Sequence, residues 1–288
     1  MVSSAKNFSL SGFIKLTRFG NLLIIALAQY FTVLFLVTDL SHWKNYILSV
    51  DLLLLSLSSI LIAAAGYIIN DYYDVKIDYI NKPERIVVGK VIKRRVVMVA
   101  HTMLNFTGIG LGFLVSPFIA VINFACALLL WLYSNQLKRL PLIGNIAVAL
   151  LTGLSIYIIE IFYHTGNEFI LIYALFASGF TLIREIIKDL EDMKGDATFG
   201  CRTLPVVVGI RKSKNIVALI SIVFVAGISF LIYEHTGQQH IWLIIGNIIA
   251  VAALLLLLYQ ADTVKQFHQL STLTKILMLI GILSMVMI

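Results

Sequence analysis

The pattern of apolar and polar positions divides the chain into long apolar runs joined by shorter polar segments. A helix needs about 20 predominantly apolar residues to cross roughly 30 Å of hydrocarbon. Nine runs come close to that length, at 20–38, 46–69, 96–115, 117–135, 142–162, 168–187, 214–233, 241–260 and 272–288. The pattern therefore predicts an all-α, polytopic membrane protein with nine transmembrane helices.

The polar segments contain nothing that resembles an independent soluble domain. The two largest are 70–95 and 188–213, and residues 1–19 mix apolar with basic side chains, which is typical of a helix lying on the membrane surface. We predict a single transmembrane domain over residues 1–288. A weak similarity between the two largest segments suggests a duplicated four-helix unit followed by a ninth helix, with coincidence in a biased composition as the alternative.

Composition supports the membrane interpretation. Hydrophobic residues make up 60% of the chain and charged residues 13%, with a mean hydropathy of +0.95, whereas an average soluble domain carries about 25% charged residues. The net charge of +7 comes from basic residues in short loops, so we do not expect a nucleic-acid partner. Cys126 and Cys201 are too far apart in sequence to form a CxxC metal site, and they do not suggest a disulfide framework.

Basic residues predict the orientation. If the chain crosses the membrane nine times, 21 of its 22 Lys and Arg residues fall on one side, and Lys44 alone falls on the other. Because such residues concentrate on the cytoplasmic side, we expect a cytoplasmic N-terminus and a C-terminus outside. The expected location is the cytoplasmic membrane of a prokaryote.

Two clusters of aspartates share the spacing D-x2-D-x3-D, each after a long apolar run: Asp71, Asp74 and Asp78, then Asp189, Asp192 and Asp196. On a helix this spacing places all three side chains of a cluster on one face. Carboxylates beside hydrocarbon are costly unless they are paired or bound to metal. Both clusters are expected on the cytoplasmic side, where they would form one polar site.

Magnesium is the cation that this chemistry favours, since it prefers carboxylate oxygens and commonly bridges them to substrate phosphates. Asn70, one turn before Asp74, is predicted as a neutral oxygen ligand beside the six aspartates. A solvated acidic loop is the alternative for either cluster alone. The repeated spacing favours a magnesium site that binds a diphosphate.

Basic and aromatic residues near the clusters are candidates for binding substrate. Lys138 is predicted to reach the phosphates, and Tyr133 to shield a cationic intermediate, although an aromatic-belt role for Tyr133 is equally compatible. Arg184 and Lys188 would balance the diphosphate charge; the alternative is a surface ion pair with Glu185. The predicted substrate-binding residues are Asn70, Lys82, Arg85, Arg184, Lys188, Arg202, Arg18, Asn21 and Ser134.

Taken together, these motifs resemble the UbiA superfamily of intramembrane prenyltransferases over nearly the whole chain. The resemblance rests on N-D-x-x-D-x-x-x-D at 70–78, Asn81-Lys82-Pro83-x-Arg85, Tyr133-Ser134 with Lys138, and D-x-x-D-x-x-x-D at 189–196. It implies nine helices around a central cavity open to the cytoplasmic side. It also implies that both aspartate motifs bind Mg²⁺ and an isoprenoid diphosphate.

Residues 184–189, Gly195-Asp196 and Thr203-Leu204-Pro205 are most similar to the geranylgeranylglycerol-phosphate geranylgeranyltransferase group. Many relatives have a proline after the residues that correspond to Arg18 and Arg85, and this chain does not. The acceptor therefore stays open between geranylgeranylglycerol phosphate or a related lipid and an aromatic hydroxybenzoate or quinone precursor.

The resulting hypothesis is transfer of a polyprenyl group, with geranylgeranyl preferred, from its diphosphate to a lipophilic acceptor among membrane lipids. No oligomeric state is predicted. The alternative of another class is an ion-coupled secondary transporter, which predicts charges near the midplane in broken helices. A CDP-alcohol phosphotransferase would require D-G-x2-A-R after Asp74. The predicted catalytic residues are Asp71, Asp74, Asp192, Asp196, Tyr133 and Lys138.

Overall fold

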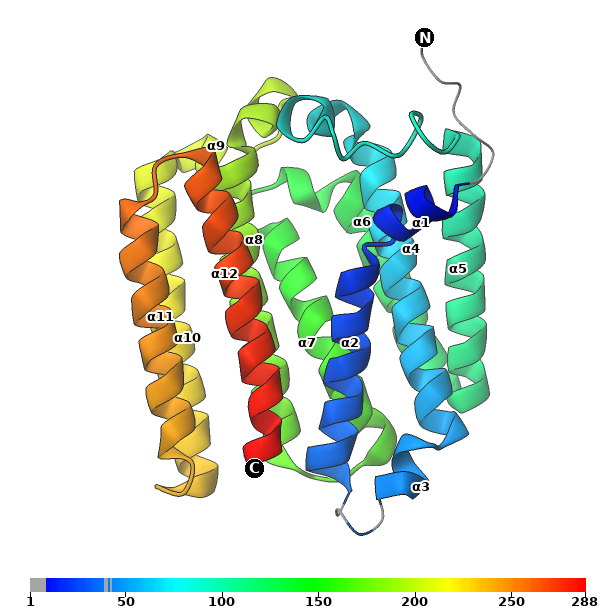
Figure 1. Ribbon diagram of the computed structural model, residues 1–288, viewed down its shortest axis with the longest axis vertical. Coiled ribbons are helices and arrows are strands. Elements are labelled where there is room, and N and C mark those ends of the chain that lie inside the picture. The colour runs from blue at the N-terminus through cyan, green and yellow to red at the C-terminus, as the bar shows by residue number, and fades with distance from the viewer. Residues whose placement is uncertain (1–8, 39–40, 42) are drawn as a thin grey trace. The chain divides into compact units, whose positions relative to one another are not determined.

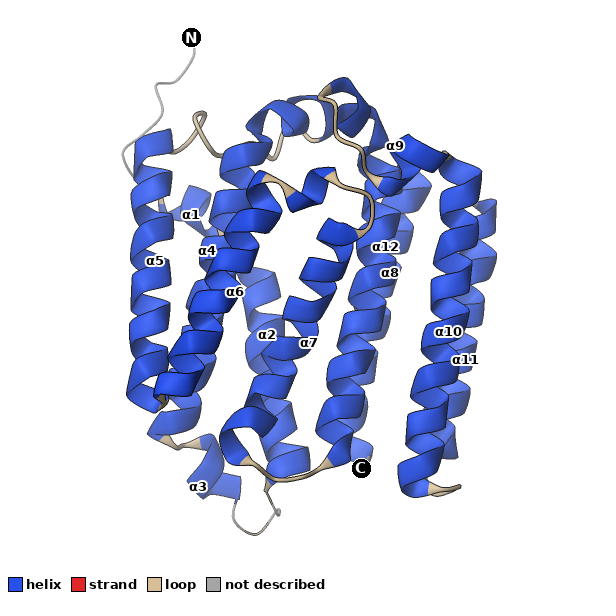
Figure 2. Ribbon diagram, turned by 180° about the vertical axis from the view of Figure 1, so that it is seen from behind, coloured by secondary structure: helices blue, strands red, loops and turns tan. Residues whose placement is uncertain are grey.

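A computed structural model describes residues 9–38, 41 and 43–288, and its regular elements are helices (Figures 1 and 2). In chain order they are α1 (Leu10–Leu16), α2 (Phe19–Thr32), the π-helix η1 (Val33–Val37), α3 (Trp43–Ile47), α4 (Val50–Asn81), α5 (Arg94–Val115), α6 (Pro117–Asn135), the 3-10 helix η2 (Leu137–Arg139), α7 (Ile143–Tyr163), α8 (Glu168–Thr198), α9 (Leu204–Val208), α10 (Ile210–Thr236), α11 (Ile241–Gln260), α12 (Val264–Leu283) and the 3-10 helix η3 (Ser284–Met287). Within the described residues, nine helical segments are long and apolar enough to span a membrane. The all-α, nine-helix prediction is therefore confirmed.

Side-chain caps account for several helix starts. Ser49 accepts from the backbone of Leu52 at the start of α4, and Asn167 accepts from Phe169 at the start of α8. Thr263 and Gln266 form a reciprocal capping box at the start of α12. Such caps satisfy backbone N–H groups that the first helical turn leaves without a partner.

The predicted helix ends differ from the observed ones at both acidic clusters. The run predicted at 46–69 continues as α4 to Asn81, and the run predicted at 168–187 continues as α8 to Thr198. The last run begins at Val264 instead of 272. Hydropathy detects the part of a helix that suits hydrocarbon, whereas the helix itself continues until its backbone is interrupted, here ahead of Pro83 and Gly200.

The predicted surface helix over 1–19 is only partly described, because residues 1–8 lie outside the described part of the chain. Residues 10–16 form α1, in which Leu16 is buried while Leu10 and Ile14 are exposed. Arg18 follows with a positive φ of 51°, a conformation that is uncommon for residues other than glycine. This residue separates α1 from α2.

The chain divides into two units. The first contains the described residues up to Tyr30 and those within 41–138. Within it, α4 packs along α5 and α6, α5 packs along α6, and α1 contacts α4. Gly108 of α5 allows close packing, since a Cβ there would lie 3.1 Å from the Ser58 carbonyl oxygen of α4. Small residues permit such approaches between membrane helices.

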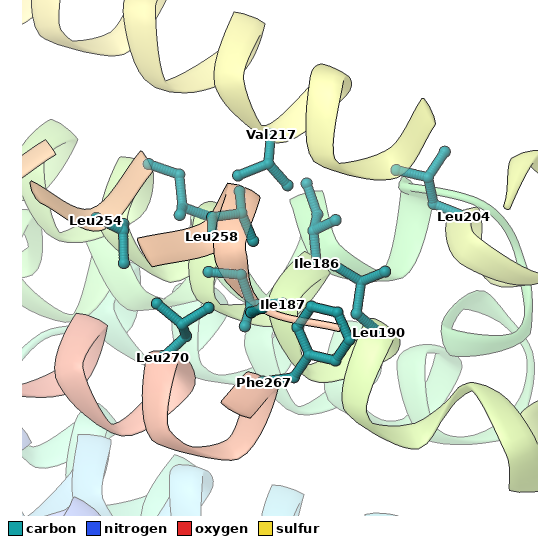
Figure 3. Packing of buried hydrophobic residues seen from close by; sticks show 11 residues of the cluster. Ile186, Ile187, Leu190, Leu204, Val217, Leu254, Leu258, Phe267 and Leu270 are labelled. Carbon is teal, nitrogen blue, oxygen red and sulfur yellow. The ribbon is translucent and has the colours of Figure 1, made fainter. Parts of the chain in front are cut away.

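The second unit contains Phe31–Thr38 and Arg139–Ile288. Its organising helix is α8, which packs against α7, α9, α10 and α12, while α11 packs against α10 and α12. Figure 3 shows the buried side chains of this unit gathered around α8: Ile186, Ile187, Leu190, Leu204, Val217, Leu254, Leu258, Phe267 and Leu270. This core fixes the helix that carries the second acidic cluster.

Candidate active site

The first acidic cluster lies on the last turns of α4 and is bonded to a cation from η2. Asn70 donates to Asp74 through Nδ2 at 2.9 Å. The Lys138 ammonium lies 2.5 Å from Asp74 Oδ1 and 3.1 Å from Asn70 Oδ1. Both members of the Lys138–Asp74 pair are largely buried, with side-chain exposures of 10% and 15%. The structure therefore brings three predicted site residues together within the first unit.

A second cation reaches the same cluster from the break between α1 and α2. The Arg18 guanidinium donates to Asp71 Oδ1 at 2.9 Å and lies 5.0 Å from the centre of the Tyr67 ring. Asn21 donates to the Tyr67 hydroxyl at 3.3 Å. Arg18, whose backbone has a positive φ, is thus also the residue whose side chain binds Asp71, a candidate metal ligand.

The second acidic cluster, on α8, accepts from neutral donors. Asn145, which is buried on α7, donates to Asp189 Oδ2 at 2.9 Å. Thr203, just after α8, donates to Asp196 Oδ2 at 3.2 Å. The Asp196 carbonyl also accepts the Cys201 N–H at 2.9 Å. Asp196 is therefore tied to the loop that ends α8.

Two basic residues of α8 are held by a neighbouring glutamate. Arg184 Nη1 and Lys188 Nζ each lie 2.8 Å from the Glu185 carboxylate, one on each oxygen. The Glu185 side chain is 8% exposed, and each of its two partners is 25% exposed. The ion pair that the sequence left as an alternative is present, but it is buried within the second unit instead of lying on a solvated surface.

Two predicted residues have their polar groups engaged elsewhere, and a third is exposed. Arg85 is exposed and lies 3.7 Å from Glu84. Ser134 is fully buried and donates to the Leu130 carbonyl at 2.8 Å. Arg202 is exposed. Their assignment to substrate binding stays a prediction.

The other predicted residues are partly buried near their motifs. Lys82 caps the C-terminus of α4, where its N–H donates to the Asp78 carbonyl at 2.8 Å. Asp78, Asp192 and Tyr133 are of intermediate exposure. Asp78 and Asp192 lie within α4 and α8, so the helical spacing assumed for the two clusters applies, and Tyr133 lies within α6.

Sequence reasoning missed Tyr67 and Asn145 and gave no role to Lys275. The only available signal for Asn145 was a polar residue inside an apolar run, which more often bridges helices than binds a ligand. Lys275 was counted only as an orientation charge. The role of each residue depends on a neighbour from another part of the chain, and the spacing of residues along one helix does not show which residues of other helices lie nearby.

The donors present fit a hard cation. Among the described residues, no three His, Cys, Asp or Glu side chains converge into a complete metal cage. Magnesium does not need one, because it is usually held by one or two carboxylates, waters and substrate phosphates. On α4 the Lys138 ammonium already lies against the Asp74 and Asn70 oxygens. A group of oxygens that holds one cation in this way has the right chemistry for another.

Comparisons with known proteins place these motifs among prenyltransferases. Residues 22–279 match the UbiA prenyltransferase family. The digeranylgeranylglyceryl phosphate synthase of Saccharolobus solfataricus is 34% identical over 280 residues, which cover 96% of each chain. The synthase of the same name from Methanosphaera stadtmanae is 34% identical over 266 residues, covering 91% of this chain and 94% of the relative.

Solved structures share the fold. A structure of digeranylgeranylglyceryl phosphate synthase in membranes has a TM-score of 0.71 and 26% identity, and the alignment covers 96% of this chain and 97% of that one. A UbiA homologue from Archaeoglobus fulgidus, bound to DMAPP and Mg²⁺, has a TM-score of 0.68 and 16% identity, covering 94% and 98%. At that identity the second likeness concerns the fold alone.

Proposed function

Because this chain belongs to the UbiA prenyltransferase family, we propose that it transfers a geranylgeranyl group from its diphosphate to geranylgeranylglyceryl phosphate or a closely related lipid. The observation that carries the choice of acceptor is the full-length similarity to relatives named digeranylgeranylglyceryl phosphate synthase. Such a name describes a product with two geranylgeranyl chains on one glyceryl phosphate. The second chain is the one that this reaction would add.

Family membership confirms the resemblance found in the motifs, and it makes this chain an integral membrane prenyltransferase. The orientation is part of the proposal. Its support is the concentration of basic residues on one side of the predicted topology. We propose that both acidic motifs face the cytoplasm of a prokaryotic cell and serve one prenyl diphosphate.

The proposed cofactor is Mg²⁺, with Asn70 and the six aspartates of the two motifs as the residues that would hold it. When bound, it would supply positive charge for the departing diphosphate. The support from this chain is the donor chemistry of α4, where carboxylate and amide oxygens already surround a lysine ammonium. Lys138 and Arg18 would add their own charge beside these oxygens.

The proposed reaction breaks the allylic C–O bond of the prenyl diphosphate, and the bonding electrons leave with the diphosphate. Positive charge develops on the allylic carbon, and the acceptor hydroxyl oxygen forms the new ether bond and loses its proton. Electrostatic stabilisation of a leaving group is often the largest contribution to catalysis. Tyr133 is the proposed shield of the allylic cation, and hydrocarbon surroundings would keep water from intercepting it.

The test is product formation by the purified protein. We expect one ether-linked product, identified by mass, when the protein is incubated with Mg²⁺, labelled geranylgeranyl diphosphate and geranylgeranylglyceryl phosphate. A panel with hydroxybenzoate and quinone precursors in place of the lipid should give no product. Transfer to the aromatic acceptors alone would replace the proposed acceptor, and cation flux into liposomes without transfer would favour a transporter.

A further inference from the structure

Three contacts define how α8 and α12 pack against each other. The Tyr173 hydroxyl lies 2.8 Å from the Ser284 hydroxyl, and the Thr181 hydroxyl lies 3.7 Å from the Met278 sulfur. Further along, His268 Nδ1 lies 3.1 Å from the Glu191 carboxylate. As residue numbers rise on α8 they fall along α12 and into η3, so the two helices are antiparallel. The Thr181–Met278 and Glu191–His268 contacts have the same register.

This register places Lys275 level with Arg184. Arg184 lies three residues after Thr181 on α8, and Lys275 lies three residues before Met278 on α12. Residues three apart share a helix face, so both side chains belong to the seam between the two helices. Lys275 is also within electrostatic range of Arg184. The register therefore places a lysine and an arginine at the same level of the seam between α8 and α12.

Positive charge exceeds negative charge at this level. Arg184, Lys188 and Lys275 contribute three cations, and Glu185 is the carboxylate that binds the first two. The sequence of α12 contains neither Asp nor Glu. Asp189, one turn further along α8, accepts from the neutral Asn145. On these two helices three cations therefore lie around one carboxylate, and like charges that are partly removed from water are costly. This excess of positive charge favours an anion.

Arg184 has a donor left over for such an anion. Its Nη1 is bonded to Glu185, whereas its buried Nε finds no acceptor among the described residues. A buried donor without a partner is costly. A phosphate oxygen satisfies this donor well, because the guanidinium fork matches phosphate geometry.

We propose that Arg184, Lys188 and Lys275 bind the phosphate of the acceptor lipid, with Lys275 as a specificity-determining residue. This inference rests on the proposed function, in which two phosphorylated substrates meet. The prenyl diphosphate is assigned to the metal-binding aspartates, whereas a phosphomonoester that carries no metal needs cations. The subsite therefore reassigns Arg184 and Lys188, which the sequence had linked to the diphosphate.

The position along α8 suits this assignment. Asp189 lies five positions after Arg184, which corresponds to a rise of about 7.5 Å along a helix axis. A glycerol backbone with its phosphate is of comparable size. The acceptor phosphate could thus lie beside Arg184 while its hydroxyl group reaches toward the level of the acidic motif.

The test compares two acceptors and two lysines of α12. Binding of geranylgeranylglyceryl phosphate and of the same lipid without its phosphate is measured in nanodiscs, without prenyl diphosphate. We expect Lys275→Gln to weaken binding of the phosphorylated lipid about 10- to 100-fold, the range for losing a charged hydrogen bond. Binding of the unphosphorylated lipid should not change. Lys265→Gln, the same change at an exposed lysine of α12, is the control.

Two further measurements separate phosphate binding by Lys275 from a structural role and from binding of geranylgeranyl diphosphate. Lys275→Arg should keep the preference for the phosphorylated lipid, and the KM for geranylgeranyl diphosphate should stay at the wild-type value in Lys275→Gln. An equal loss for both lipids would assign Lys275 a structural role and overturn the proposal. A raised KM for geranylgeranyl diphosphate would move these cations back to the donor substrate and overturn it as well.

Failure of this inference differs from failure of the proposed function. If the wild-type protein forms the ether product but Lys275→Gln keeps its preference for the phosphorylated lipid, the subsite is wrong and the function stands. If the wild-type protein binds the phosphorylated lipid preferentially, and loses that preference in Lys275→Gln, yet makes no product, the function is wrong and the subsite stands.

Discussion

The acidic motifs of α4 and α8 have the same aspartate spacing and different electrostatic surroundings. On α4, Asp71 and Asp74 are bonded to cations that come from outside the helix, Arg18 and Lys138. On α8, the bonds to Asp189 and Asp196 come from the neutral side chains of Asn145 and Thr203. Arg184 and Lys188 of α8 are instead bonded to Glu185.

This difference shows that a repeated motif need not have a repeated role. In the first motif Asp71 and Asp74 bind cations directly, whereas on α8 Asp189 and Asp196 accept from neutral side chains while Arg184 and Lys188 bind Glu185. Because Arg184 and Lys188 do not bind the aspartates of α8, these two cations can also bind a substrate while Asp189 and Asp196 keep their hydrogen bonds to Asn145 and Thr203. The following substitutions test this contrast, from the largest expected effect to the smallest.

Loss of either motif should abolish transfer if both are essential. We expect Asp74→Ala and Asp192→Ala each to lower kcat by about 100- to 1000-fold or more, the effect of removing one preorganised electrostatic contact. Radiolabelled product formation in membranes measures this loss, and chelation of divalent ions should reproduce it. Asp51→Ala, at an exposed aspartate in the first turn of α4, is the control. Wild-type turnover in Asp74→Ala/Asp192→Ala would refute the assignment of both motifs.

The buried glutamate of α8 should matter mainly for stability. Glu185→Gln leaves Arg184 and Lys188 without their shared carboxylate, and breaking a buried ion pair costs about 3–5 kcal/mol. Because both cations are one-quarter exposed, we expect about 2–3 kcal/mol. Unfolding in a detergent titration measures the free energy. Glu168→Gln, at the exposed start of the same helix, should change it by less than about 0.5 kcal/mol, and equal effects of the two substitutions would contradict the role of Glu185.

The sequence was sufficient for those parts of the fold that depend on local properties. Nine spans follow from hydropathy, because each helix must match the hydrocarbon by itself. The predicted apolar runs are shorter than the helices where polar residues continue a helix, as at Asp71 in α4 and Asp192 in α8. Hydropathy reports the environment of a residue, and helix formation depends on backbone hydrogen bonds, so the two end at different residues.

For the candidate site too, the sequence predicted features that depend on spacing along one helix. The aspartate spacing predicted that each cluster shares one helical face. Lys138 was predicted to reach the phosphates, and the structure places its ammonium against Asp74 of the first motif. Asn145 and Lys275 were not predicted, since each depends on the packing of α7 or α12 against α8. Arg18 was a candidate, but its bond to Asp71 depends on the break between α1 and α2, which the sequence pattern did not reveal.

Lys138 should act as a counter-charge for the first motif when metal is absent. In metal-free protein, Lys138→Met leaves Asp74 and Asn70 without their bonded ammonium, and we expect a loss of about 1–3 kcal/mol in unfolding free energy. Added Mg²⁺ should stabilise this variant more than it stabilises the wild type, because the ion no longer competes with the ammonium. Unfolding titrations with and without Mg²⁺ measure the difference. Lys76→Met, at an exposed lysine of α4, is the control. If Mg²⁺ raised the unfolding free energy of Lys138→Met and Lys76→Met equally, the ion and the Lys138 ammonium would not compete for the same oxygens.

The smallest effect is expected at the neutral partner of the second motif. Asn145→Ala removes one buried hydrogen bond to the Asp189 carboxyl group and should cost about 1–2 kcal/mol, since that group loses a donor from a buried side chain. Added Mg²⁺ should not stabilise this variant more than it stabilises the wild type. The group that Asn145→Ala removes from Asp189 is a neutral amide, so the substitution takes away no cation for Mg²⁺ to replace. Asn215→Ala, at an exposed residue of α10 that accepts from Tyr259, is the matched substitution. If Asn145→Ala responded to Mg²⁺ as strongly as Lys138→Met, the two motifs would share one electrostatic arrangement, and the contrast between α4 and α8 would be lost.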